Sequence, residues 1–320
     1  GTAAAARLVF GRNIFNSRNL TFEPNVNMAT PPNYRLGPGD EVIIDVWGAN
    51  EASMRKTISP EGNIMVNLLG PVYLNGMTVA EANSFLKKEF SKIYSQVSGA
   101  NPESEVRLTL GQIRSIQINV MGEVAVPGTY MLSSLSTVFH ALYRAGGVNN
   151  IGSLRSIRVM RGSNCIADLD VYDYILKGKL LDDIRLMEGD VIIVPPYEKL
   201  VDISGKVKRP MYYEMKKNET LATLIKYAGG FSGDAYTKGV RLVRQSGREY
   251  KLFNIDEMDY SVFHLDDGDA VTVGSILDRF ENRVEVRGAV YRSGMYELSG
   301  NMNTVKQLIQ KAEGLKGDAF

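Results

Sequence analysis

Cysteine and histidine are nearly absent from this sequence. Among its 320 residues there is one cysteine, Cys165, and there are two histidines, His140 and His264. A single cysteine excludes an internal disulfide, and two histidines leave almost nothing for a transition-metal site, so we expect no metal and no cofactor. The pattern around Cys165 favours a small buried side chain. For both histidines a structural role is favoured.

The sequence also lacks an excess of charge and a long apolar run. Its 37 basic and 36 acidic residues nearly balance, so no global field draws the chain to nucleic acid or to an anionic membrane. No apolar run approaches the roughly 18 to 20 residues that span a bilayer. The opening GTAAAARLVF has no methionine and no signal-sequence pattern, and we interpret it as a processed or trimmed start. The length predicts two to four domains.

What the sequence does contain is an internal repeat. Gly122, Gly205 and Gly288 lie 83 residues apart (205−122 and 288−205), and a tyrosine eight positions later keeps the same spacing. Apolar and polar residues alternate around each glycine, which predicts half-buried strands. A glycine within such a strand indicates a bulge or a close approach of another backbone.

Each repeat predicts two strands, a short helix, two more strands and a returning edge strand, which is a β-grasp-like α+β unit. Glycines in AGG, AGG and AEG end the three helices. Gly189-Asp190 and Gly268-Asp269 form the tight turn before the returning strand. The candidate helix N-caps are Ser136, Asn218 and Asn303.

The third copy is incomplete, since it covers only residues 283–320. One residue is inserted before its helix, so Val305 lies 84 residues beyond Leu221. A β-grasp unit without its closing strands exposes an apolar face. We therefore expect the natural chain to continue past Phe320.

The front of the chain is a different unit. It contains LGPGDEVIIDV, a Gly-Asp segment similar to those at the turns of the repeats. Thr78 and Glu81 predict a capping box, and Leu86 and Phe90 belong to the apolar stripe of the helix that it starts. Residues 1–33 have no clear period and predict a lead-in with one short helix.

Together these motifs resemble a known family. YRLGPGDEVIIDVWG and TISPEGNIMVNLLGPVYLNGMTVAEA resemble the polysaccharide export domain of bacterial outer-membrane capsule and exopolysaccharide exporters. VMGEVAVPGTY, AGG and EGDVIIVP resemble the soluble-ligand-binding β-grasp (SLBB) domains that follow it. The resemblance implies an α+β fold with an export domain followed by tandem SLBB domains, the last one truncated. The expected units are a lead-in at 1–33, the export domain at 34–113, SLBB repeats at 114–198 and 199–279, and a partial repeat at 280–320.

The resemblance also implies a function. Such a protein is a non-enzymatic periplasmic lipoprotein at the outer membrane, a homo-oligomer in full length, that conducts polysaccharide and works with an inner-membrane export partner. The lipidated cysteine and the C-terminal amphipathic helix of that family are not in this sequence, and we expect the first to have been trimmed and the second to lie beyond Phe320. More than two SLBB copies depart from the simplest exporters of the family, so the pore architecture is not carried over. We expect this segment alone to be a monomer or to associate weakly.

Two other functions stay open, a soluble glycan- or ligand-binding module and a polysaccharide-processing enzyme. The enzyme is disfavoured because the acid pairs Asp182-Asp183 and Asp266-Asp267 are neighbours, whose side chains point apart. Candidate contacts recur at the repeat period. Tyr130 and its equivalent Tyr213 fit either sugar stacking or core packing, and packing is favoured. Four arginines fit either a solvated strand edge or contacts with subunits or acidic sugars: Arg158, Arg161, Arg241 and Arg244.

Overall fold

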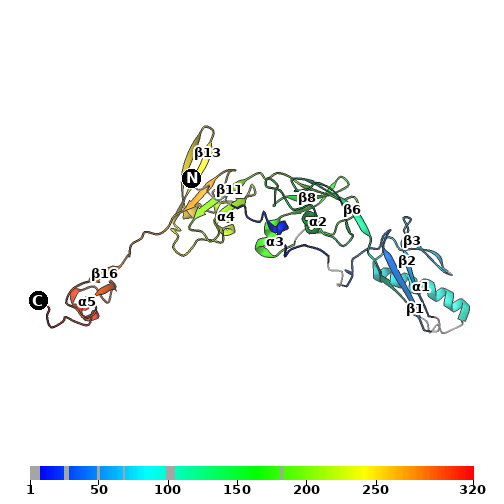
Figure 1. Cartoon of the computed structure of the whole chain (residues 1–320), viewed down its shortest axis with the longest axis horizontal. Helices are drawn as coiled ribbons and strands as arrows, with labels where there is room; N and C mark the ends of the chain where they lie inside the picture. Colours follow the sequence, from blue (N-terminus) through cyan, green and yellow to red (C-terminus); the bar gives the residue numbers. More distant parts are fainter. Residues whose placement is uncertain (1–7, 25–28, 49–50, 68, 99–104, 181–182) are drawn as a thin grey trace.

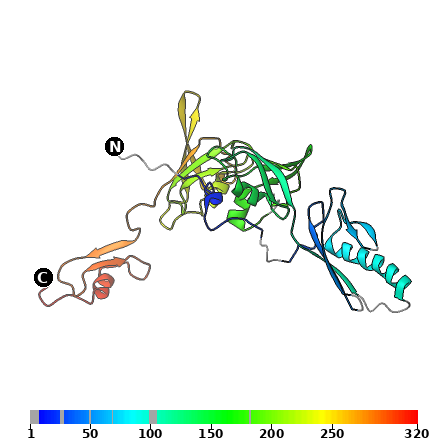
Figure 2. The ribbon, with the colours of Figure 1, turned by 45° about the vertical axis from the view of Figure 1, so that its right-hand side comes forward.

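The computed structural model describes residues 8–24, 29–48, 51–67, 69–98, 105–180 and 183–320. In Figures 1 and 2 the front domain lies at one end, two β-grasp repeats lie in the middle, and a smaller third repeat lies at the other end. This order of α+β units confirms the predicted fold class. Within the described ranges, none of the helices combines the length and the hydrophobicity that crossing a membrane requires.

The front domain folds a small sheet against a long helix. In its sheet β1 lies between β2 and β5 and is antiparallel to both. Thr78 and Glu81 form the predicted capping box, each side chain accepting the backbone N–H of the other at 3.2 Å. Its elements are β1 (Glu41–Trp47), β2 (Ala52–Thr57), the hairpin β3 (Asn63–Val66) and β4 (Gly70–Tyr73), α1 (Val79–Ser98) and β5 (Glu105–Leu110).

The first repeat is one mixed sheet with the strand order β7-β6-β10-β8-β9. The returning strand β10 pairs parallel with β6 and antiparallel with β8, so the expectation of an edge strand was wrong. The strand is apolar throughout, and Ile192 and Val194 are fully buried, which suits a central position. The elements are β6 (Ser115–Gly122), β7 (Gly128–Ser133), α2 (Val138–Arg144), β8 (Ile157–Arg161), β9 (Asn164–Leu169), α3 (Val171–Lys177) and β10 (Val191–Val194).

The second repeat has the same topology, with the order β12-β11-β15-β13-β14. Gly122 and Gly205 end the equivalent strands β6 and β11, both with φ of +85°, which confirms the repeat that the spacing predicts. The elements are β11 (Leu200–Gly205), β12 (Met211–Glu214), α4 (Leu221–Tyr227), β13 (Gly239–Ser246), β14 (Glu249–Asp256), the 3-10 turn η2 (Glu257–Asp259) and β15 (Ala270–Val273). The third repeat contains β16 (Arg283–Val286), β17 (Gly294–Glu297) and α5 (Val305–Lys311).

The helices of the repeats begin one or two residues later than predicted. Each is preceded by a threonine with extended backbone, the conformation that an N-cap requires. In the third repeat the hydroxyl of this threonine accepts the backbone N–H of Gln307 at 3.2 Å. The N-caps are therefore Thr137, Thr220 and Thr304, and not Ser136, Asn218 and Asn303.

Cys165 is exposed, so the prediction of a buried thiol was wrong. The register of β8 and β9 shifts between Val159 and Met160. As a result Ala167 pairs with Val159 inside the core, whereas Cys165 pairs with Met160 near the hairpin tip. The sequence pattern of β9 does not reveal this bulge.

The described part of the lead-in packs its aromatic side chains into the core of the two middle repeats. Phe10 donates its N–H to the Tyr212 carbonyl at 2.9 Å, which attaches the lead-in to the edge strand β12. Further along, the short 3-10 helix η1 (Ile14–Asn16) places the Phe15 ring 5.7 Å from that of Phe139. The lead-in and both repeats share one hydrophobic core cluster, and the front domain has a separate one.

Candidate functional site

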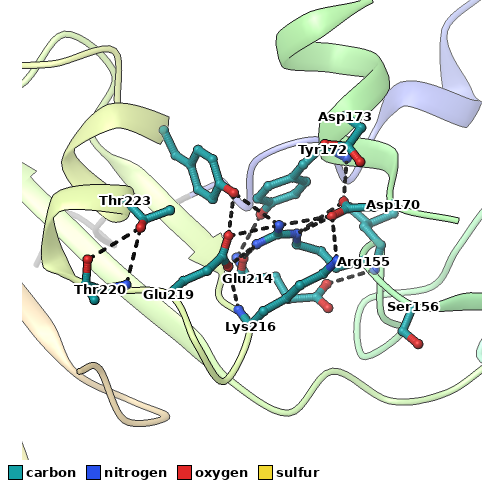
Figure 3. Close-up of polar contacts among 12 residues, drawn as sticks. Arg155, Ser156, Asp170, Tyr172, Asp173, Glu214, Lys216, Glu219, Thr220 and Thr223 are labelled. Carbon is teal, nitrogen blue, oxygen red and sulfur yellow. Dashed lines mark hydrogen bonds and ion pairs between the residues drawn. The ribbon is translucent and has the colours of Figure 1, made fainter. Parts of the chain in front are cut away.

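The junction between the two middle repeats is built around one buried arginine. Arg155 is 5% exposed and lies just before β8. Its guanidinium donates to Asp170 of the first repeat at 3.0 to 3.2 Å and to Glu219 of the second at 3.1 Å. The same group lies 4.5 Å from the centre of the Tyr172 ring and 5.2 Å from that of Tyr227. One side chain therefore bridges both repeats (Figure 3).

The electrostatics of this cluster favour the charged forms. Burial alone lowers the pKa of Arg155, but the hydrogen bonds and charges of Asp170 and Glu219 outweigh it, so the pKa is raised. Burial likewise raises the pKa of Asp170, but Arg155 and Lys216 outweigh it, so this pKa is lowered. The Lys216 Nζ lies 2.9 Å from the Asp170 carboxylate. Arg155 and Asp170 therefore form an ionised pair at the junction.

Glu214 is the second polar link between the repeats. Its carboxylate accepts the Ser153 hydroxyl at 2.6 Å and the Leu154 N–H at 2.8 Å. Burial raises the pKa of Glu214, only partly opposed by these hydrogen bonds and by the charges of Arg155 and Arg12. A raised pKa means that the folded state disfavours the charged carboxylate near neutral pH.

We expect Glu214→Gln to lower the melting temperature at pH 7 by less than Glu214→Ala. The amide oxygen can accept the Leu154 N–H and no charge is buried, but the amide NH2 would face the Ser153 hydroxyl oxygen, which already accepts the Arg155 and Ser156 N–H groups. Because the folded pKa of Glu214 is raised, the wild type carries at pH 7 a penalty for its charged carboxylate that is absent below the unfolded pKa, about 4.5, so the wild type should gain stability relative to Glu214→Gln as the pH falls. Glu214→Ala leaves both donors unpaired and should cost about 1 to 3 kcal/mol. Equal losses for the two variants, measured by calorimetry at pH 7, would show that the charge itself is required.

The lead-in completes the junction from a third side. The Phe10 ring lies 5.0 Å from the Tyr172 ring and 5.2 Å from the Tyr213 ring, between the two repeats. Arg12 donates to the carbonyls of Asn149 at 2.8 Å and Gly152 at 2.5 Å. Three segments far apart in the sequence therefore fix the relative placement of the two sheets.

A cleft of about 470 Å³ opens beside this junction. Arg158 lines its first-repeat side, and Lys216 and Lys217 line its second-repeat side. Arg158 and Lys217 are exposed, and the Lys216 side chain is half exposed. Asp168 and Glu198 line the cleft as well, and Lys216 already pairs with Asp170. Arg158 and Lys217 are the cations placed to contact carboxylates of an acidic sugar, and the Arg158 guanidinium can do so with two hydrogen bonds. No group of three or more His, Cys, Asp or Glu side chains in the described ranges is placed to hold a metal ion.

The predicted arginines divide into two kinds. Arg161 and Arg244 each form an ion pair at 2.9 Å, with Asp190 and Asp269 respectively. Both aspartates are buried at the predicted Gly-Asp turn, where each accepts a backbone N–H of its own turn at 2.8 Å. The front domain repeats this arrangement with Asp40 and Arg114.

Arg158 and Arg241 are the exposed members of the set. Arg158 lines the cleft at the junction, and Arg241 lines an equivalent hollow on the second repeat. The two predicted tyrosines face the core. Tyr213 is fully buried and donates to the Arg209 carbonyl at 2.7 Å, and the partly buried Tyr130 donates to the Val126 carbonyl at 2.5 Å. Tyr213 therefore packs inside the core and Tyr130 packs against it.

Sequence reasoning missed the residues that join the repeats. Arg155, Glu214 and Glu219 belong to no motif, and their contacts depend on how two sheets dock. Periodicity offered one signal, because Glu214 recurs as Glu297 at the 83-residue spacing. His140, expected to be structural, is buried with its Nδ1 3.3 Å from the Thr21 carbonyl of the lead-in. Of the acid pairs, Asp182 lies outside the described residues.

Comparisons with known proteins agree with this arrangement. Residues 28–109 match the family model of polysaccharide biosynthesis/export proteins, and residues 117–194 and 200–253 match models of the SLBB domain. The chain is 26% identical over 292 residues to two Escherichia coli proteins named polysialic acid transport protein KpsD, covering 91% of the chain. It spans about half the length of these relatives, 50% in both. These matches support a polysaccharide export protein with SLBB domains.

Proposed function

We propose that this chain is a non-enzymatic component of a polysaccharide export machine. The observation that carries the proposal is the order of its parts, an export domain followed by SLBB repeats that share one core. The polar groups at the junction of the repeats bond to one another and hold the two sheets together. This is the chemistry of a scaffold and not that of a reaction centre.

The finer parts of the proposal concern place and assembly. The full-length protein works on the periplasmic face of the outer membrane and forms a homo-oligomeric ring that forms or extends the conduit. An inner-membrane export partner delivers the polysaccharide to it. The KpsD relatives support the choice of an export pathway, since their name describes transport of polysialic acid.

The cleft beside the junction supports an acidic polysaccharide as cargo. Arg158, Lys216 and Lys217 line it, and exposed cations suit a transient contact, because exposed ion pairs contribute only up to about 1 kcal/mol each. A conduit needs contacts of this strength, since tight binding would stop the polysaccharide from moving through it. A soluble glycan-binding module is the second candidate function, and the same cleft is what favours it.

We expect the double variant Arg158→Glu/Lys217→Glu to bind an acidic polysaccharide about tenfold more weakly, because a loss of about 1.4 kcal/mol is a tenfold change. The probe is polysialic acid, and affinity is measured by surface plasmon resonance at fixed ionic strength. Lys306→Glu, on the exposed face of α5 in the third repeat, is the matched control and should change little.

Export itself is tested in cells. Deleting the gene should deplete surface polysaccharide and retain it inside the cell, and the full-length wild type should restore export. The double variant in the full-length protein should restore it poorly at equal protein level. Normal surface polysaccharide in the deletion strain would reject the export role, and a binding defect without an export defect would favour the soluble module.

A further inference from the structure

One face of the second repeat resembles the first-repeat side of the junction already described. Tyr236, Lys238 and Arg241 line a hollow of about 390 Å³. Each lies 83 residues after a residue that lines the first cleft, namely Ser153, Arg155 and Arg158. The first cleft has an additional wall, made by Glu214, Met215, Lys216 and Lys217 of the following repeat. The hollow on the second repeat lacks the corresponding wall.

Equivalent residues are buried at the first junction and exposed at the second. Tyr172 lies two residues after Asp170 in the first repeat, and Met258 lies two residues after the equivalent Asp256 in the second. Tyr172 is 1% exposed, whereas Met258 is 83% exposed. Both aspartates are the N-cap of a short helix after the hairpin. Tyr236 is itself 50% exposed. The second repeat therefore presents an uncovered copy of the face that the first repeat buries.

The third repeat carries the complementary side. Tyr213-Glu214-Met215 of the second repeat recurs as Tyr296-Glu297-Leu298, 83 residues later. Met215 is 3% exposed and Leu298 is 47% exposed, so the same apolar position is buried in one copy and open in the other. At this position the three repeats have Met131, Glu214 and Glu297, so the glutamate occurs only where another repeat precedes it.

The polar groups of the first junction have partial counterparts at the second. Lys238 stands where the first junction has Arg155, and it pairs with Glu257 at the surface at 3.2 Å. The Glu214 carboxylate contacts the Ser153 hydroxyl and the Leu154 N–H, so a docked third repeat would bring Glu297 to the equivalent Tyr236 and Thr237. Lys311 stands where the second repeat has Tyr227, given the one-residue insertion before α5, and would lie near Lys238, so Glu297 is the group that can offset these two cations.

The linker permits this docking. The loops that leave β10 and β15 start alike, since Ser153 N–H bonds the Pro195 carbonyl at 2.7 Å and Tyr236 N–H bonds the Gly274 carbonyl at 2.8 Å. Residues 195–199 join the first two repeats, and residues 274–282 join the second and third. The second linker is therefore four residues longer than the first, which lets it span up to about 13 Å more. In Figures 1 and 2 the linker is extended and the third repeat stands away from the second.

We propose that the third repeat of this chain docks on the second repeat of the same molecule, in the way that the second repeat docks on the first. The docking site is the hollow at Tyr236, Lys238 and Arg241 with the exposed Met258 beside it, and the docking element is the end of β17 with Glu297 and Leu298. Docking would convert the extended third unit into the next step of a regular stack.

Distances between spin labels test the proposal. In a Cys165→Ser background, Arg158→Cys with Lys217→Cys reports the existing junction, and Arg241→Cys with Gly300→Cys reports the equivalent positions of the proposed one. All four positions are exposed, so labelling should leave the fold intact, which circular dichroism checks. We expect a narrow distance distribution from the second pair, with a maximum near that of the first.

Two further measurements make the test decisive. Glu297→Lys should remove the narrow population, whereas Glu281→Lys in the linker should preserve it. The narrow population should also survive dilution with a large excess of unlabelled protein, because both labels are in one molecule. A broad distribution from the second pair at all conditions overturns the proposal, and so does a short distance that disappears on dilution, which would indicate docking between two copies.

Discussion

Replacing Arg155 by methionine is expected to uncouple the two middle repeats and to cost about 3 to 5 kcal/mol of local stability. The guanidinium is the shared partner of Asp170 and Glu219. Without it, Asp170 keeps only the partly exposed Lys216 and Glu219 loses its cation, and leaving a largely buried charge unpaired is strongly destabilising. Hydrogen exchange read by mass spectrometry should show the loss in peptides of both repeats, while peptides of the front domain, which has a separate core, stay protected.

Two comparisons make this result specific to the junction. Arg158→Met changes an exposed arginine of the next strand and should stay within about 0.5 kcal/mol of the wild type. Adding Asp170→Asn and Glu219→Gln to Arg155→Met should recover part of the loss, because the unpaired charges are removed. Loss of protection in the first repeat alone would mean that Arg155 stabilises its own repeat and does not join the two.

The repeat architecture was predictable because it depends on local periodicity. The spacing of Gly122 and Gly205, the alternation around them and the Gly-Asp turns all report on single strands and turns. The position of β10 was not predictable in this way, since pairing between strands far apart in sequence is a tertiary property. The prediction that Cys165 is buried failed for a related reason, because one bulge reverses which side chains of the strand face the core.

The site was less predictable than the fold. Arg161 and Arg244 were candidate contacts because they recur at the repeat spacing. They recur because each pairs with the buried aspartate of its own repeat. Arg155 and Glu219 form the junction, yet they come from opposite repeats, and no spacing within one repeat connects them. The lead-in has no clear period and predicted only one short helix, yet Phe10 lies between the repeats. Contacts of this kind follow from docking, which a single sequence does not encode locally.

Gly122→Ala and Gly205→Ala are expected to destabilise their repeats by about 3 to 5 kcal/mol each. A Cβ at Gly122 would lie 2.3 Å from the Val194 carbonyl oxygen, and one at Gly205 would lie 2.1 Å from that of Val273. Both obstacles are backbone atoms of the central returning strand, which cannot rotate away as a side chain can. The φ of +85° adds the further cost, roughly 1 to 2 kcal/mol, that an L-residue has in this region.

Gly162→Ala and Gly247→Ala separate these two causes. Both glycines lie at hairpin tips with φ of +62° and +63°, and an added Cβ would meet nothing within 4 Å, so only the backbone cost of about 1 to 2 kcal/mol remains. Thermal unfolding followed by circular dichroism, together with hydrogen exchange of β10 and β15, measures the four variants. Because the repeats are equivalent, Gly122→Ala and Gly205→Ala should show similar losses, each larger than its hairpin control. If all four variants lose the same amount, the central strands can shift to admit a methyl group, and the close approach of the two backbones is not what fixes glycine at the 83-residue spacing.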